Sequence, residues 1–373
     1  IPYAEFVSLM ALLNILTVPA MTLTTVMARF VAEYAYGNAV VAWVTVVRRA
    51  MRRIAILGTA FFVVWTLLSG FLRDILNAPS QMSLIILGAI AFIRLFRPIV
   101  RGTLQGSKRF GWMAVSRIGS ALFQIIFVLL AVNFFSGVTS VMIAVLGATV
   151  LAVLLGCWPF CQILKETKPL SSYDTQHIYA YLGPVFLSQV ALFVLMNADL
   201  ALSIRYLDGI ELRAYPKAAT LARTVLFVAQ PIAIVMFPRA VVSPRLRLIV
   251  GPLLFSFIIS FIVALTLFFF PSLALKAMYG MSGPIHESLL RRYVWAVLPL
   301  TSASLIAQYL WARNKIFLVL YLLPVGFAYL IQIMFYQHDA KSIISALCLW
   351  GWIGLGILCA ITFLKIDRSK SSL

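Results

Sequence analysis

Three arginines lie inside an apolar stretch of the chain and share the spacing of one helix face. Arg94, Arg97 and Arg101 stand at i, i+3 and i+7, so their side chains fall within about 60° of one another on a helix. Guanidinium groups stay protonated and bind phosphate oxygens through two parallel hydrogen bonds. Such a row would suit an anionic, phosphate-bearing substrate in a polar cavity, or side chains that snorkel to the membrane surface.

Five cations in all are expected inside membrane-spanning segments. We take them as candidate substrate-binding residues: Arg94, Arg97, Arg117, Arg223 and Lys217. Arg223 lies about nine residues into its segment, near the expected membrane midplane. Snorkelling explains it least well, because an arginine at that depth costs about 2.5–3.5 kcal/mol on insertion scales.

Two acidic residues accompany these cations, Glu5 and Asp199. Asp199 is expected either to pair with Lys217 or Arg213 across a short hairpin, or to act in ion coupling. In the second case it would bind a proton or sodium ion, or serve as the counterion of an empty cavity. Glu5 is a candidate for the same role.

Residues for catalysis or metal binding do not form a recognisable pattern. The four cysteines and three histidines lack metal-ligand spacing, and no hydrolase triad or phosphate-cradling loop is evident. We therefore expect no enzyme activity, no cofactor and no metal.

Composition places the chain in a membrane. Hydrophobic residues make up 63% of the 373 residues and charged residues 11%, with a mean hydropathy of +1.02. A soluble domain has about 25% charged residues, so a polytopic membrane protein is indicated. The net charge of +19 comes from cations scattered over short loops, which favours membrane lipids or an anionic substrate over nucleic acid.

About eleven segments have the length of roughly 20 residues that crosses a bilayer. They are 3–27, 54–72, 82–100, 112–135, 138–164, 178–204, 214–237, 248–270, 293–311, 316–336 and 342–364. One set of alternate loops, with the C-terminal tail, holds eighteen cations and the other set seven. The positive-inside rule then places the C-terminus in the cytoplasm and Ile1 outside. We infer a missing first helix and twelve spans in the intact protein.

An internal repeat supports two similar halves. The spacing of Tyr3 and Pro19 recurs in Tyr215 and Pro231. A second, weaker sequence similarity pairs LQGSKRF at 104–110 with LWARNKIF at 310–317. The offset covers six spans, so both halves cross the membrane in the same direction. The expected fold is all-α, with two pseudo-symmetric six-helix lobes around a central cavity: an N-terminal lobe 1–164, a cytoplasmic linker 165–177 and a C-terminal lobe 178–373.

Three stretches resemble the polysaccharide flippases of the multidrug/oligosaccharidyl-lipid/polysaccharide (MOP) exporter superfamily. They are YAEFVSLMALLNILTVPAMTLTTVMARFVAEY at 3–34, RGTLQGSKRFGWMAVSRIGSALFQIIFVLLAV at 101–132, and the run from VFLSQV to MFPRAV at 185–241. In the last of these, Asp199 and Tyr215 stand at the family's aspartate and aromatic positions.

The resemblance implies a flippase of the cytoplasmic (inner) membrane that works by alternating access. Its substrate would be a polyprenyl-diphosphate-linked oligosaccharide for surface polysaccharide synthesis, and a glycan polymerase and glycosyltransferases are possible partners.

Alternatives stay open. A MATE-like drug/ion antiporter would have the same lobes but would favour acidic residues in its cavity, and a peptidoglycan-precursor flippase would carry another lipid-linked cargo. A membrane glycosyltransferase or glycan polymerase would need a large outer loop with catalytic residues. The expected outer loop at 271–292, with Glu287, Arg291 and Arg292, keeps that class in consideration.

Overall fold

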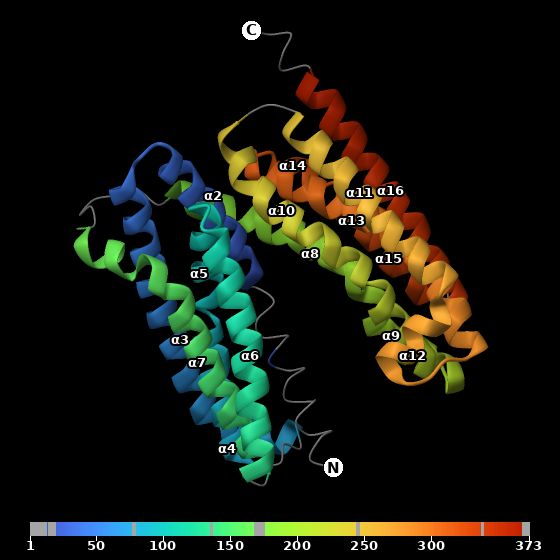
Figure 1. Cartoon of the computed structure of the whole chain (residues 1–373), viewed down its shortest axis with the longest axis horizontal. Helices are drawn as coiled ribbons and strands as arrows, with labels where there is room; N and C mark the ends of the chain where they lie inside the picture. The colour runs from blue at the N-terminus through green and yellow to red at the C-terminus, as the bar shows by residue number, and fades with distance from the viewer. Residues whose placement is uncertain are drawn as a thin grey trace. The chain divides into compact units, whose positions relative to one another are not determined.

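The described part of the protein is helical throughout. The computed structural model describes residue 13 and residues 20–76, 80–134, 137–167, 176–243, 247–336 and 339–367. Its helices, shown in Figure 1, are α2 (Ala20–Tyr36), α3 (Val40–Leu76), α4 (Gln81–Arg94), α5 (Arg97–Gly106), α6 (Phe110–Phe134), α7 (Val138–Glu166), α8 (Gln176–Tyr206), α9 (Gly209–Ala222), α10 (Thr224–Val242), α11 (Arg247–Phe269), α12 (Pro271–Tyr279), α13 (Pro284–Ala312), α14 (Ile316–Val319), α15 (Leu322–Tyr336) and α16 (Ala340–Asp367).

Among these residues, ten helical segments are long and apolar enough to cross a membrane. This confirms a multi-pass, all-α membrane protein. The first expected span, 3–27, lies mostly outside the described residues. The other ten expected spans each coincide with one of the observed segments.

The chain divides into two compact units, 1–182 and 183–373. The boundary lies within α8, so that helix contributes to both units. The lobe and linker limits expected from the sequence stay a prediction, because 168–175 in the expected linker lie outside the described residues.

Two helices are longer than hydropathy indicated. The sequence predicts a connection between the expected spans 3–27 and 54–72, but α3 already begins at Val40 and is 37 residues long. Its Arg48 donates to the carbonyl oxygens of Leu164 and Thr167 at the end of α7. An arginine that satisfies the free carbonyls of a helix end stabilises both helices outside the apolar region.

The expected outer loop at 271–292 is also largely helical. It contains α12 and the first turns of α13, which begins at Pro284. Glu287 lies in the first turn of α13, where the helix dipole stabilises a carboxylate. The large catalytic loop that a glycosyltransferase or polymerase would need is therefore absent from this region.

The core of unit 1 forms where α4 packs against α3 and α7. Leu84, Leu87 and Ile90 of α4 are fully buried together with Met142 of α7. A second close packing joins α2 and α5. There a Cβ on Gly106 would lie 2.7 Å from the carbonyl oxygen of Ala28, so only glycine allows the two backbones to approach.

Helices α4 and α5 are two halves of one span, interrupted at Leu95 and Phe96. Pro98 explains the break, because it has no N–H to donate to the carbonyl of Arg94. The break separates Arg94, the last residue of α4, from Arg97, the first of α5.

Unit 2 is built around α13. In the most apolar window of this helix, 89% of the residues are buried, and α13 packs against α9, α10, α11 and α16. Trp311 near its end donates from Nε1 to the Ser188 hydroxyl of α8 at 2.8 Å. Helix α13 is thus the central helix of unit 2, and it contacts the helices that carry the polar network of this unit.

Candidate functional site

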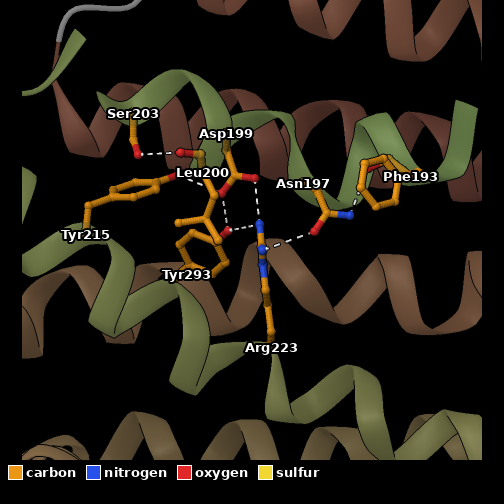
Figure 2. A network of polar contacts seen from close by, with 8 residues as sticks. All are labelled: Phe193, Asn197, Asp199, Leu200, Ser203, Tyr215, Arg223 and Tyr293. Carbon is orange, nitrogen blue, oxygen red and sulfur yellow. Dashed lines mark hydrogen bonds and ion pairs between the residues drawn. The ribbon is translucent and has the colours of Figure 1, made fainter. Parts of the chain in front are cut away.

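A buried carboxylate is the centre of a polar network in unit 2. The Asp199 side chain on α8 is fully buried. Its Oδ2 accepts a hydrogen bond from the Tyr215 hydroxyl at 2.9 Å and another from the Tyr293 hydroxyl. Its Oδ1 accepts from Nη2 of Arg223 at 2.7 Å (Figure 2). The carboxylate is thus held by two hydroxyls and one guanidinium, as a buried charge requires.

Arg223 contacts three other side chains of this network, counting Asp199. Its Nη2 also donates to the Tyr293 hydroxyl at 3.1 Å, while Nη1 makes a longer contact of 3.4 Å with Oδ1 of Asn197. The side chain is 13% exposed. One edge of the guanidinium is therefore fixed by Asp199, whereas the other makes only the longer contact with Asn197.

The elements that place these side chains come from four parts of the chain. Asn197 and Asp199 lie two residues apart on α8, Tyr215 on α9 and Tyr293 on α13, and Arg223 is the residue between α9 and α10. Arginine side chains in helices point back toward the N-terminus, which is the direction from Arg223 to Tyr215. The two tyrosine rings meet edge to face at 5.7 Å.

The sequence-based pairing of Asp199 was wrong. Its partner is Arg223 and not Lys217 or Arg213. The Lys217 ammonium group instead lies 3.0 Å from the Met281 sulfur. Proximity along the hairpin suggested the nearer cations, but Arg223 reaches the carboxylate because the chain breaks at the end of α9 and the side chain points back along it.

A third tyrosine adjoins the network without joining it. Tyr329 of α15 is fully buried, and its hydroxyl has no hydrogen-bond partner among the described residues. It interacts electrostatically with Asp199, Tyr293 and Arg223. Sequence reasoning missed both Tyr293 and Tyr329, since each lies far from Asp199 in the chain and only tertiary packing brings it close.

Four arginines form a second cluster, in unit 1. Arg94 ends α4, Arg97 and Arg101 lie on α5, and Arg117 lies on α6. Arg97 donates from Nη2 to the Ser120 hydroxyl at 2.8 Å. A small pocket lies at this point, lined by Arg97 and Arg101 together with hydroxyl groups of α6.

These four cations lack a compensating acid. Within the described residues, none of Arg94, Arg97, Arg101 and Arg117 forms an ion pair, and the Arg94 Nε is buried without a hydrogen-bond partner. Arg101 is repelled by both Arg97 and Arg117. A bound polyanion would remove this repulsion, because each cation would gain an opposite charge nearby.

The candidate residues therefore divide into two clusters. Arg94, Arg97 and Arg117 gather in unit 1, whereas Arg223 and Asp199 meet in unit 2, with Lys217 apart from them. Glu5 lies outside the described residues. In the part of the chain that the structure describes, no group of three or more histidine, cysteine or acidic side chains could hold a metal ion.

Comparison with known proteins finds similarity in structure only. No protein-family profile and no curated protein sequence matches the chain. The outward-facing structure of a multidrug resistance MATE family transporter of the MOP superfamily matches with a TM-score of 0.81 and 14% identity, covering 100% of this chain and 89% of that one. Its inward-facing counterpart matches with a TM-score of 0.67 and 15% identity, covering 98% and 91%.

A crystal structure of MATE in complex with MaD3S is also similar, with a TM-score of 0.78 and 13% identity over 98% of this chain and 89% of that one. The chain thus has the two-lobe fold of these transporters. At this level of sequence identity the similarity shows the fold but does not show the substrate. Membership of the polysaccharide branch therefore stays a prediction.

Proposed function

We propose that this protein is a flippase that moves a polyprenyl-diphosphate-linked oligosaccharide across the cytoplasmic membrane by alternating access. The observation that carries the proposal is the cluster of four arginines in unit 1. Their charges have no acidic partner among the described residues, although they lie in or next to membrane-spanning helices. Uncompensated cations at such depth are costly unless they serve a substrate, and an anionic one fits them.

A diphosphate matches the chemistry of this cluster. Arg97 already donates to a hydroxyl oxygen of Ser120, so its guanidinium is oriented and needs little reorganisation to bind a phosphate oxygen. Several spread contacts would also let the substrate leave again, which transport requires as much as binding. The glycan and the apolar chain need no charged residue.

Arg223 of unit 2 is proposed as a further contact. Asp199 holds the guanidinium by Nη2, so the carboxylate acts as the resident anion while no substrate is bound. A phosphate can bind at the Nη1 edge, or replace the carboxylate altogether. In the latter case Asp199 would need a proton or another cation, which would couple substrate binding to an ion. Lys217 and Glu5 remain secondary candidates for these two roles.

A MATE-like drug/ion antiporter is the second candidate, and two observations favour it. The similar solved structures include a multidrug resistance transporter, and the buried Asp199 would suit a proton or a cationic substrate. The four arginines weigh against a cationic substrate, because they would repel it. A peptidoglycan-precursor flippase would share the diphosphate chemistry and differs only in the cargo.

The test is leaflet-resolved labelling of the lipid-linked intermediate in a strain that lacks the gene. Without the protein, the intermediate should accumulate in the inner leaflet, and the wild-type chain should restore its appearance in the outer leaflet. Arg97→Gln should abolish this and Arg97→Lys should restore part of it, because a lysine keeps the charge but loses bidentate binding. Arg52→Gln, which removes an exposed arginine on α3, is the matched control. Efflux of cationic dyes with unchanged intermediate would favour the antiporter.

In this proposal the C-terminus is cytoplasmic, the glycosyltransferases act before the transport step, and the glycan polymerase acts after it. The partners are expected to supply substrate on the cytoplasmic side and to use it on the outer side.

A further inference from the structure

Unit 2 carries an apolar groove between α10 and α11. The groove has a volume of about 590 Å³, with Val235 and Met236 contributed by α10 and Gly251 and Phe255 by α11. Arg239 is the one charged residue among the described residues that line it. All of these residues lie in the same compact unit.

Helix periodicity and glycine chemistry explain why the groove exists. Pro231, Val235 and Arg239 follow one another at i, i+4 and i+8 and so form one row along α10. On α11, Gly251 has no side chain, and a Cβ built there would meet no atom within 4 Å. Phe255, one turn further along, is 57% exposed and forms one wall. Open space is thus left beside the α10 row at the position of Gly251.

The described lining of the groove has a cation at one end and apolar residues along the rest. Arg239 is exposed and lies in the last turn of α10, and its side chain forms no hydrogen bond or ion pair with the described residues. The remaining lining toward Pro231 is hydrocarbon. A single apolar chain with a phosphate at one end matches this order, with the phosphate at Arg239 and the chain running toward the middle of the span.

Hydrophobicity alone does not select an occupant, because lipid tails are as apolar as the groove itself. Selection must come from the cation and from the width of the groove. A glycerophospholipid carries two chains, whereas a polyprenyl phosphate carries one.

We infer that this groove is a loading site for the polyprenyl chain of the transported lipid, with Arg239 binding its phosphate. The inference rests on the proposed function. Helix α10 connects the groove to the polar network, since it starts directly after Arg223 and has Arg239 in its last turn. The two arginines are about 24 Å apart along the helix axis, so a phosphate released from Arg239 can advance along one helix.

Photo-cross-linking tests the inference. The purified protein is placed in nanodiscs with a polyprenyl phosphate that carries a diazirine in its chain, and labelled peptides are mapped. Label is expected on the segment 231–255, reduced by unlabelled polyprenyl phosphate but not by equal amounts of phosphatidylglycerol or neutral polyprenol. Label absent from this segment, or displaced equally well by phosphatidylglycerol, would overturn the assignment.

Two substitutions with matched controls separate binding from folding. Gly251→Leu adds an apolar side chain where a Cβ meets no atom within 4 Å, and Arg239→Gln removes the charge. Each should lower labelling about tenfold. The controls are Gly356→Leu, an exposed helical glycine with equally open space, and Arg205→Gln, an arginine in the last turn of α8. Both should label within about twofold of the wild type. Loss of labelling in the controls as well would contradict a specific groove.

The two proposals fail separately. A wild-type protein that translocates the lipid-linked oligosaccharide without labelling 231–255 would overturn the loading site and leave the flippase intact. A protein that is labelled there, selectively for polyprenyl phosphate, yet translocates no oligosaccharide would support the groove and overturn the proposed function.

Discussion

At the scale of single residues, the protein uses its charged groups in two different ways. In unit 2 the Asp199 carboxylate and the Arg223 guanidinium neutralise each other, with tyrosine hydroxyls satisfying the remaining hydrogen bonds. In unit 1, Arg94, Arg97 and Arg101 have no such partner among the described residues. A buried pair is costly to break from one side, because the remaining charge is left without its partner. These three arginines of unit 1 have no such partner to lose among the described residues.

The pair itself makes a stability prediction. Asp199→Asn and Arg223→Gln should each destabilise the protein by about 3–5 kcal/mol, since each leaves the other charge buried and unpaired. The double variant should lose less than the sum of the two, because no lone charge remains. Chemical unfolding in detergent measures all three. Additive losses would mean that the two groups do not interact in the folded protein.

Two of the tyrosines around Asp199 should respond differently to loss of the hydroxyl. Tyr215→Phe removes a donor from a buried carboxylate and should cost about 1–3 kcal/mol. Tyr329→Phe removes a buried hydroxyl that has no partner among the described residues and should be neutral or slightly stabilising. Thermal unfolding of the two single variants decides this. A large loss in Tyr329→Phe would show that its hydroxyl is bound in the folded protein.

Sequence reasoning reached only part of this residue-scale account. The cations within the spans and Asp199 could be found because charges inside apolar runs are conspicuous. The pairing of Asp199 with Arg223 could not be found in this way, and neither could Tyr293, which is 94 residues away in the chain and enters only through the packing of α13. Which side chains pair depends on the directions in which they point, and the spacing of residues along the chain does not give those directions.

At the scale of elements, backbone interruptions place the cations. The break between α4 and α5 at Pro98 separates Arg94 from Arg97, and the break between α9 and α10 falls at Arg223 itself. Hydropathy located these spans but not their breaks, since it averages over about 20 residues. It also missed the polar start of α3, whose Arg48 is bound by the end of α7.

Alanine should have opposite effects on stability at two glycines, one in the close packing of α2 on α5 and one in open space on α7. Gly106→Ala would place a Cβ 2.7 Å from a backbone oxygen of α2, and should destabilise by about 1–3 kcal/mol. Gly147→Ala, within α7, meets no atom within 4 Å and should stabilise by about 0.5–1 kcal/mol through helix propensity. Thermal unfolding of the two variants is the measurement. A neutral Gly106→Ala would mean that the two helices can separate without loss.

At the scale of the whole molecule, the fold was accessible from the sequence and the substrate was not. Span lengths and loop charges follow from the bilayer as a solvent, and the repeat can be read from the sequence itself. The all-α fold with two lobes could therefore be anticipated, and it is shared with MATE transporters. A substrate depends on which side chains meet in a cavity, and the same fold accommodates different cargoes.

Orientation is a prediction at this scale. The eighteen cations of one loop set should lie in the cytoplasm. A fluorescent protein fused at the C-terminus should therefore fluoresce, and a cysteine introduced at Asp208, in the short connection between α8 and α9, should react with an impermeant reagent added outside the cells. Labelling only after the cells are opened would reverse the orientation.

The central claim is that the arginines of unit 1 carry an anionic lipid through the membrane. Proteoliposomes with the purified protein and a labelled polyprenyl-diphosphate-linked oligosaccharide test it most directly, by counting how much label becomes accessible on the opposite side. We expect transfer by the wild type, loss of transfer in Arg97→Gln and normal transfer in Arg52→Gln. Undiminished transfer by Arg97→Gln, or transport of a cationic dye in place of the lipid, would contradict the claim.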